Sequence, residues 1–335
     1  MKKENKNIVE GILWSVGSVA SAAAAAAAGW IFYSRKYVRH DMEMEKAIDA
    51  ELKDYESELA GRLSYYVSEN ESGVPLLLLH SINAASSAFE MKPIFDHYQG
   101  QRPVYALDLP GFGFSDRGNR VYSPILFQQA ISSFITDVIG VPTDVVALSL
   151  SCEFAALSAV HDPDNIRSLV MISPTGFQPP KGDNISERAQ KRGSKNYVYA
   201  GLAVELWNRP FFDLVSSRPS IQFFLNKSFE GLVPERFVDY AYQTSHQPGA
   251  QHAPTYFLSG KLFTPAVRET VYQVLTQPVL VLYDRDPHTN FEMLPIFLQE
   301  KGDWKAVRVS PTKGLPHWEA PEKTFNALDN FWSEQ

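Results

Sequence analysis

The 335-residue chain has a single cysteine, Cys152, so it cannot form an intramolecular disulfide. It also lacks any cluster of lysine and arginine with interleaved aromatic residues, and its net charge is −7. This charge balance argues against nucleic-acid binding. Apolar residues are plentiful, at 44% of the chain, with aromatic residues at 13%. That is enough for a sizeable hydrophobic core, and the length suits one large domain with an insertion.

Histidine and cysteine do not gather into a metal-binding pattern. His246 and His252 share a loop rich in glutamine, proline and glycine, and no third ligand accompanies them. We therefore expect neither a metal nor a cofactor.

One stretch near the middle of the chain predicts a strand, an abrupt turn and a helix. Residues 145–148 form a short apolar run suited to a buried strand, and the Ala- and Leu-rich sequence from Cys152 onward suits a helix. Ser149 lies at the turn, with the small residues Ala147 and Ser151 two positions away on either side. Such a turn would hold the hydroxyl above the sheet edge, close to a helix N-terminus. Because neither glycine of a G-x-S-x-G pattern is present, an ordinary buried serine is the alternative interpretation.

Two further apolar strands precede this one, and each ends in a distinctive turn. Residues 75–83 read PLLLLHSIN and residues 103–117 read PVYALDLPGFGFSDR. The second segment matches a D-x-P-G-x-G-x-S loop at Asp108, Pro110, Gly111, Gly113 and Ser115. With these motifs in this order, the chain resembles the α/β-hydrolase superfamily from about residue 62 to residue 335. Members usually have a His-Gly turn after the first of these strands; here His80 matches and Ser81 replaces the glycine.

The resemblance implies an α/β fold with a mostly parallel, doubly wound sheet and a helical cap insertion. It makes Ser149 the nucleophile and implies an oxyanion hole built from two backbone N–H groups, which by position belong to Ile82 and Leu150. His80 is expected to brace its loop by hydrogen bonding. A serine at this turn argues against the epoxide hydrolases and haloalkane dehalogenases of the superfamily, which use aspartate there.

The catalytic acid implied by the resemblance should follow the buried strand at residues 278–283. Asp286 is favoured, because Asp286 and Pro287 align with an Asp-Pro pair that is common in the superfamily. Asp284 is the alternative. Both carboxylates could instead cap the helix that follows.

The catalytic base is expected in residues 314–322, GLPHWEAPE, after the last predicted strand. Family members often have G-H-x-P-H-x-E-x-P here, and the first histidine is catalytic. In this chain Gly314 occupies that slot, whereas His317 matches the second histidine. Either the loop is rearranged so that His317 reaches Ser149, which we favour, or the triad is incomplete and the protein is a non-catalytic relative.

A complete triad of Ser149, Asp286 and His317 would make the protein a serine hydrolase. We expect it to cleave a carboxylic ester or thioester of a small to medium, fairly apolar substrate through an acyl-enzyme. A non-catalytic binding protein on the same fold and a hydrolase of carbon–carbon bonds are the alternatives.

Residues 11–34 carry no charge, and a segment of this length can span a membrane. A membrane anchor, a cleavable signal peptide and a soluble Ala-rich helix are three possible interpretations. The anchor is favoured because the apolar run continues through the aromatic residues 30–33, past any Ala-x-Ala cleavage site. We expect residues 1–40 to anchor the chain in lipid. Basic residues on both sides of the span are balanced, so they do not orient it.

The remaining boundaries follow from composition and spacing. Residues 41–61 alternate acidic and apolar residues and predict an amphipathic spacer helix. About 100 residues separate two predicted core strands, far more than an ordinary crossover loop, so residues 178–277 are expected to form an aromatic-rich helical cap. Residues 62–177 and 278–335 are then the two parts of the α/β-hydrolase core.

Overall fold

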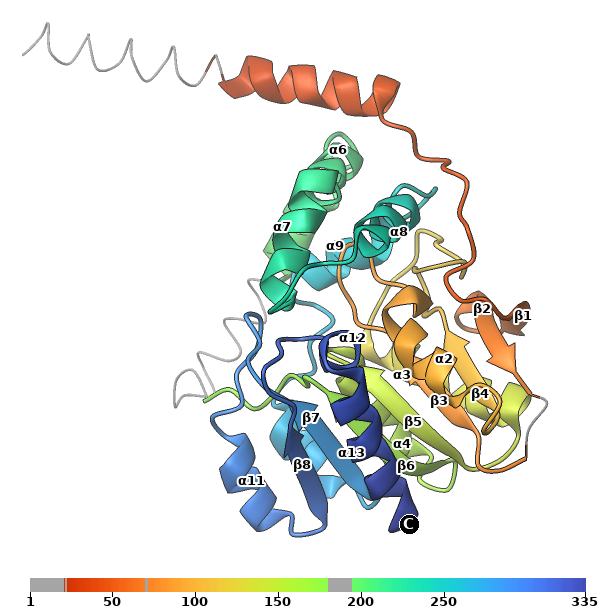
Figure 1. The fold of residues 1–335 in the computed structure, drawn as a ribbon. Helices are drawn as coiled ribbons and strands as arrows, with labels where there is room; N and C mark the ends of the chain where they lie inside the picture. Colours follow the sequence, from red (N-terminus) through yellow and green to blue (C-terminus); the bar gives the residue numbers. More distant parts are fainter. Residues whose placement is uncertain (1–20, 22, 70–71, 180–194) are drawn as a thin grey trace, which may run out of the picture.

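The computed structural model describes residues 21, 23–69, 72–179 and 195–335. Its centre is one eight-stranded sheet in the order β1-β2-β4-β3-β5-β6-β7-β8 (Figure 1). The pairs β1·β2 and β2·β4 are antiparallel, and every other neighbouring pair is parallel. The expected mostly parallel α/β sheet is therefore confirmed.

The strands from β3 to β7 coincide with the apolar runs of the sequence, because parallel strands covered on both faces are apolar throughout. The edge strand β8 is more polar and largely exposed. The strand bounds are β1 Glu51–Ser57, β2 Gly61–Ser68, β3 Leu76–Leu79, β4 Val104–Leu107, β5 Thr143–Leu148, β6 Ile166–Ile172, β7 Val279–Tyr283 and β8 Trp304–Arg308.

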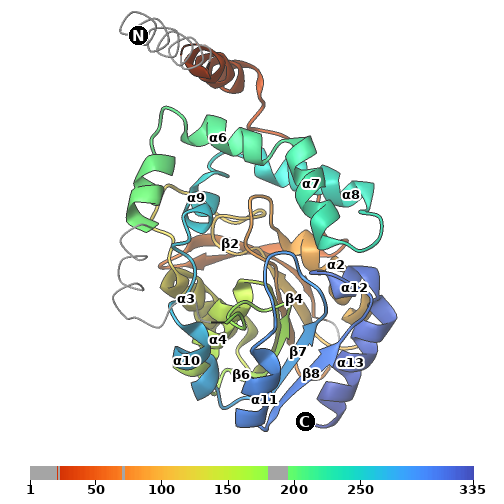
Figure 2. The ribbon, with the colours of Figure 1, turned by 90° about the vertical axis from the view of Figure 1, so that its left-hand side faces the viewer.

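Helices cover both faces of the sheet (Figure 2). Those of the core are η1 Ala88–Met91, α2 Lys92–Tyr98, α3 Pro124–Phe134, η2 Ile135–Ile139, α4 Ser151–His161, α11 Leu294–Glu300, α12 Pro316–Glu319 and α13 Pro321–Ser333. Alternate residues of β3 point to opposite layers: Leu77 joins the cluster that contains Phe127 of α3, and Leu78 joins the cluster that contains Phe95 of α2 and Leu328 of α13. The sheet is thus doubly wound.

The spacer helix expected at residues 41–61 is not formed, and this prediction is wrong. The segment contains β1, which pairs antiparallel with β2 from Glu51 opposite Val67 to Ser57 opposite Gly61. Helix propensities differ by only a few tenths of a kcal/mol per residue, so hydrogen bonding to a neighbouring strand outweighs them. That neighbour is not visible in the local pattern of acidic and apolar residues.

Between β6 and β7 the described chain is largely helical. Residues 195–202 are helical. They are followed by α6 Asn208–Val215, α7 Arg218–Ser228, α8 Glu235–Ser245, α9 His252–Leu258, α10 Val267–Thr270 and η3 Tyr272–Val274. We call residues 195–277 the helical insertion.

Two contacts place the helical insertion over the carboxyl edge of the sheet. Thr264 N donates to Glu153 Oε2 at 2.6 Å, and Arg117 Nη1 donates to Thr244 O at 2.7 Å. Glu153 lies in the first turn of α4, after β5, and Arg117 lies in the loop after β4. Figure 1 shows α6 to α9 gathered at this end of the molecule.

Residues 23–37 form a helix that contacts α6. Trp30 Nε1 donates to Pro210 O at 2.7 Å, and Ser34 Oγ donates to Asp213 Oδ2 at 2.6 Å. Within the part of the chain that the structure describes, no helix is long and apolar enough to cross a membrane. Most of the N-terminal half of the predicted span lies outside the described residues.

Candidate active site

Ser149 lies at a sharp backbone turn between β5 and α4. Its φ is +57°, a conformation that non-glycine residues seldom adopt. Two hydrogen bonds hold the turn: Ser149 N donates to Ile172 O at 2.8 Å, and Cys152 N donates to Ser149 O at 3.2 Å. Such a conformation costs about 1–3 kcal/mol and persists only where the surroundings enforce it, which is common at functional sites.

His80 braces the loops that surround this turn. Its Nε2 accepts from Leu109 N at 3.0 Å, so Nδ1 carries the proton and donates to Ser81 O at 2.6 Å. Its carbonyl oxygen accepts from Ser151 Oγ at 2.5 Å. Burial lowers the pKa of His80 to about 4, so the ring is neutral. His80 therefore connects the loops after β3, β4 and β5 and is not arranged as a proton carrier.

The two backbone N–H groups that we assigned to the oxyanion hole belong to the loops that His80 connects. Leu150 N follows Ser149 directly, and Ile82 N lies in the loop after β3. Among the described residues, neither N–H donates a hydrogen bond to the protein, whereas the neighbouring Ser81 N donates to Glu90 Oε2 at 2.7 Å. Both N–H groups are thus available to an added acceptor.

Glu90 is a buried acid that sequence reasoning missed. It also accepts from Ser81 Oγ at 3.1 Å and from Asn83 Nδ2 at 3.0 Å, so it fixes the loop that carries Ile82. Burial raises the pKa of Glu90 to about 7, against the opposing effect of these hydrogen bonds. The one available signal was a lone acid within the small and apolar residues 84–91.

Asp286 faces the position where family members carry their catalytic histidine. A Cβ built on Gly314 would lie 3.1 Å from Asp286 Oδ2, which is closer than an ordinary Cβ contact, and 3.7 Å from its Cγ. On its other side, Asp286 Oδ1 accepts from His288 N at 2.7 Å. Burial raises the pKa of Asp286, although the His288 N–H opposes this rise.

The carboxylate of the alternative acid, Asp284, accepts hydrogen bonds from β8 and the loop after it. Its Oδ1 accepts from Arg308 Nε at 2.7 Å and its Oδ2 accepts from Thr312 N at 2.9 Å. Burial would raise the pKa of Asp284, but these two bonds outweigh it and the pKa is lowered. Asp284 therefore holds the loop between β8 and α12 in place.

His317 lies in α12, fully buried, and points to η1. Its Nε2 donates to Glu90 O at 2.7 Å, beside Trp318 Nε1, which donates to the same oxygen at 2.7 Å. Its Nδ1 is buried without a hydrogen-bond partner among the described residues. Burial lowers the pKa of His317 to about 4. In this conformation His317 is hydrogen-bonded to neither Ser149 nor Asp286, so its role as the base stays a prediction.

Ser173 is a second strained serine at the same edge, and sequence reasoning missed it as well. It follows β6 with a φ of +47°, and its N donates to Leu282 O at 2.9 Å. Its hydroxyl is buried and interacts with the Asp286 carboxylate, where it opposes the rise in pKa that burial causes. The turns after β5, β6 and β7 therefore bring Ser149, Ser173 and Asp286 to one edge of the sheet.

The residues that follow Ser149 in α4 are structural. Glu153 accepts from Thr175 Oγ1 at 2.5 Å and from Thr264 N at 2.6 Å, which ties α4 to the helical insertion. Burial raises the pKa of Glu153 to about 7. The buried Cys152 thiol donates to Ala147 O, and burial raises its pKa far from the range of a reactive thiolate.

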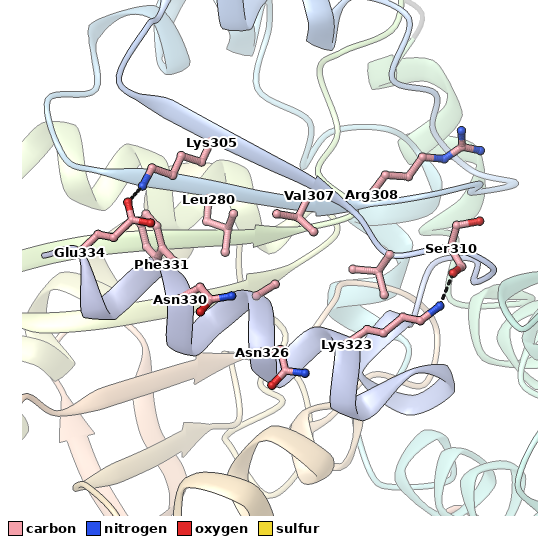
Figure 3. Close-up of a pocket in the computed structure, with 12 residues that line it drawn as sticks. Leu280, Lys305, Val307, Arg308, Ser310, Lys323, Asn326, Asn330, Phe331 and Glu334 are labelled. Carbon is pink, nitrogen blue, oxygen red and sulfur yellow. Dashed lines mark hydrogen bonds and ion pairs between the residues drawn. The ribbon is translucent and has the colours of Figure 1, made fainter.

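A pocket of about 460 Å³ lies elsewhere, between β8 and α13 (Figure 3). Lys305, Lys323 and Asn326 are among its lining residues, and Lys323 Nζ donates to Ser310 O at 2.7 Å. None of the expected site residues lines it. In the described parts of the chain, no group of three or more His, Cys, Asp or Glu residues could hold a metal ion.

The chain belongs to the α/β-hydrolase family, because residues 76–328 match the model of that family. This confirms the resemblance found in the sequence. The matched region runs from the start of β3 into α13, so it contains every strand of the parallel part of the sheet.

The chain is similar to a 2-(acetamidomethylene)succinate hydrolase from Mesorhizobium japonicum, with 27% identity over 135 residues. This match covers 40% of the chain and 48% of the relative, so the chain spans about half the length of that curated protein. Among solved structures, a serine hydrolase involved in carbazole degradation has a TM-score of 0.66 and 15% identity, covering 85% of this chain and 100% of its own. A membrane phospholipase A has a TM-score of 0.63 and 20% identity, covering 98% of each chain. Identities this low show a shared fold alone.

Proposed function

We propose that the protein is a serine hydrolase that cleaves a carboxylic ester or thioester through an acyl-enzyme on Ser149. The observation that carries this proposal is the strained turn at Ser149, directly before α4. The unpaired N–H groups of Ile82 and Leu150 support it, because an oxyanion needs such donors. Relatives that are called a hydrolase and a serine hydrolase support the same class of reaction.

The chemical steps follow from these groups. Ser149 Oγ attacks the acyl carbon and loses its proton to a base, while the carbonyl oxygen becomes an oxyanion held by the two N–H groups. Collapse of this intermediate expels the alcohol or thiol, which takes the proton from the base. Water then releases the acyl group by the same route. Asp286 would stabilise the base in its charged form, and His317 could be that base only after leaving Glu90 O.

We propose that the helical insertion is a cap that gives the substrate an apolar environment. Its contacts with Glu153 and Arg117 hold it over the carboxyl edge, where ligands of open α/β sheets bind. Its aromatic residues suit a substrate with a fairly apolar acyl part.

The direct test is labelling of the purified full chain with a fluorophosphonate probe. We expect the wild type to be labelled and Ser149→Ala to be unlabelled, whereas Ser173→Ala, a change at the other strained serine, keeps the label. Circular dichroism would show that each variant is folded. Equal labelling of the wild type and Ser149→Ala would contradict the proposal.

A non-catalytic binding protein is the second candidate. It is favoured by Gly314 in the usual histidine position and by the bond between His317 Nε2 and Glu90 O. If this candidate is correct, the fluorophosphonate probe does not label the folded wild type, whether or not imidazole is added as a base. It does not label the Gly314→His variant either.

We also propose that the N-terminal segment holds the chain at a membrane, with lipid as its partner. Residues 11–34 are uncharged, and the helix at residues 23–37 ends in exposed Phe32, Tyr33 and Tyr37. Aromatic side chains of this kind concentrate at membrane interfaces. The similar membrane phospholipase A, covered over 98% of its length, supports the proposal.

Flotation of the full chain with phosphatidylcholine vesicles tests this membrane proposal. We expect the wild type to float and the double variant Ala24→Lys, Ala27→Lys to stay at the bottom, because two charges in a span are costly. Leu232→Lys, at an exposed position in the helical insertion, is the matched control and should float. Flotation of the double variant would contradict the proposal that the N-terminal segment is a membrane anchor.

A further inference from the structure

Exposed aromatic side chains gather in two parts of the molecule. Among the described residues, every exposed phenylalanine, tyrosine or tryptophan lies in the helix at residues 23–37 or in the helical insertion. Those of the helical insertion are Tyr197, Trp207, Phe211, Phe223 and Phe224. The large apolar side chains that are exposed in the described α/β core are all aliphatic. Exposed apolar residues that gather in one place mark an interaction surface.

Helix α6 turns an apolar side to the surface of the molecule. Trp207, Phe211 and Leu214 are spaced at i, i+4 and i+7, so they share one side of the helix, and they are 41%, 37% and 49% exposed. On the opposite side, Phe212 and Asp213 are buried. A surface helix normally has polar residues on the side that faces water. The exposed side of α6 is therefore suited to an apolar environment.

Helix α7, which follows directly, exposes a second pair of aromatic side chains. Phe223 and Phe224 are 54% and 46% exposed, and the centres of their rings lie 5.3 Å apart. Lys227 Nζ lies 4.2 Å from the centre of the Phe223 ring. The helix at residues 23–37 has a similar arrangement, with Lys36 Nζ 5.5 Å from the centre of the Phe32 ring. Exposed rings beside lysines are typical of helices that lie at a membrane interface.

Hydrogen bonds hold α6 at the level where the proposed membrane span ends. Trp30 and Ser34, both in the uncharged segment 11–34, donate to residues of α6. The next residue, the charged Arg35, donates to two backbone oxygens just before α6 at 3.1 Å. Figure 1 shows this N-terminal helix running above α6 and α7. With the segment in a bilayer, α6 lies at the headgroup level, where an interfacial helix buries its apolar side by about 5–10 Å.

We infer that the exposed apolar sides of α6 and α7 form a second membrane contact of this protein, beside the N-terminal segment. We call this the α6–α7 surface, and it consists of Trp207, Phe211, Leu214, Phe223 and Phe224. The inference goes beyond the proposed hydrolase function and rests on the proposed membrane anchor.

Lipid is favoured over a second copy of the chain as the occupant of the α6–α7 surface. The bonds from Trp30 and Ser34 bring this surface to the bilayer whenever the N-terminal segment is inserted. Lys227, beside the Phe223 ring, is exposed and matches the charge of headgroup phosphates. The contact holds the helical insertion, and with it the edge of the sheet where Ser149 lies, close to lipid.

The test is a local one, because an inserted span alone makes the chain float. The fluorophore NBD is attached to single introduced cysteines in the full chain, in phosphatidylcholine vesicles whose lipids carry a nitroxide quencher on the upper acyl chain. We expect the fluorescence to fall by about half at Leu214→Cys on α6 and at Phe223→Cys on α7, the depth expected for an interfacial helix. Cys152 is buried, and the chain without an added cysteine measures any labelling of it.

Two further positions are the controls. Leu232→Cys, at a 97% exposed position of the helical insertion outside the α6–α7 surface, should keep its fluorescence. Ala28→Cys, in the helix at residues 23–37, should be quenched if that segment is inserted. Circular dichroism would show that each variant is folded.

The controls separate failure of this inference from failure of the anchor. Quenching at Ala28→Cys alone, or equal quenching at Leu232→Cys, would overturn the inference and leave the anchor standing. If Ala28→Cys is not quenched either, the anchor and the inference both fail, whereas fluorophosphonate labelling of Ser149 still tests the hydrolase. A blue shift at Leu214→Cys that grows with the protein-to-lipid ratio, without quenching, would mean that a second copy covers the surface, and lipid contact would be wrong.

Discussion

The turn after β5 should hold the proposed nucleophile and the loop after β8 the proposed base, yet the two segments differ in structure. After β5, the backbone itself is specialised, with Ser149 at a φ of +57° and two N–H groups left unpaired nearby. After β8, Gly314 has no positive φ, and His317, three residues further on, donates to Glu90 O. Two N–H groups suited to the proposed oxyanion hole are unpaired, whereas His317, the predicted base, is hydrogen-bonded to Glu90 O and not to Ser149.

This difference shows that the two parts of the candidate site are held by different kinds of interaction. The turn at Ser149 is enforced by hydrogen bonds from β6 and α4, which also hold the fold together. A base depends on the position of one side chain, and at position 314 the chain has glycine. The four predictions below test this contrast, from the largest expected effect to the smallest.

The largest effect is expected from Gly314→His. An imidazole beside Asp286 should raise the rate of probe labelling by at least about 100-fold, because a positioned general base contributes 10²–10⁴-fold. The rate should rise with pH between about 6 and 8, since only the neutral ring accepts a proton. The pH–rate profile of labelling is the measurement. A double variant that adds Asp286→Asn should lose most of the increase in rate. If the increase remains, the introduced imidazole does not pair with Asp286.

Replacing each of the two aspartates after β7 by asparagine should change the free energy of unfolding by different amounts. Asp284→Asn places an NH₂ group against Arg308 Nε or Thr312 N, which are both donors, and should lower the free energy of unfolding by about 1–3 kcal/mol. Asp286→Asn keeps an acceptor for His288 N and places its NH₂ group near the Ser173 hydroxyl, which accepts hydrogen bonds, so stability should change by less than about 1 kcal/mol.

Urea unfolding at pH 8 measures both aspartate variants. A large loss for Asp286→Asn would mean that its carboxylate supports the fold, and the contrast between the two loops would then disappear.

Glu153→Gln should change how stability depends on pH. The folded-state pKa of Glu153 is about 7, above the ordinary 4.5, so its contribution to stability is complete below pH 4.5 and is lost as the pH rises through 7. The glutamine does not titrate. Relative to the wild type, the free energy of unfolding of the variant should therefore rise by about 2–3 kcal/mol between pH 5 and pH 8. Unfolding curves at several pH values test this, and parallel curves would refute it.

The smallest effect is expected from His317→Gln. The glutamine amide can still donate to Glu90 O, so the cost at pH 8 should be about 1 kcal/mol, whereas His317→Leu loses the donor and should cost more. The pKa of His317 is lowered to about 4, so its contribution is complete above pH 6.5 and is lost as the pH falls toward 4. At pH 5 the wild type should have lost about 2 kcal/mol of this contribution, so the gap between wild type and His317→Gln should close or reverse, as thermal unfolding at both pH values would show.

The parallel strands and the turn at Ser149 could be predicted from the sequence because they are local. An apolar run of four to eight residues between polar turns defines a buried strand without knowledge of its neighbours. The edge hairpin could not be predicted this way, since β1 becomes a strand only by pairing with β2. The helical pattern at residues 41–61 is a local signal, and pairing of β1 with β2 outweighs it.

The sequence by itself determined the family, the apolar runs that become β3 to β7, the serine at the turn and the glycine at position 314. Only the tertiary structure decided that Asp284 supports a loop, that Asp286 faces Gly314, and that His317 bonds to a carbonyl 227 residues away. The physical reason is that periodicity and turn composition act along the chain, whereas the partner of a buried polar side chain is chosen through space. Glu90 and His317 meet only after the sheet has brought their loops together.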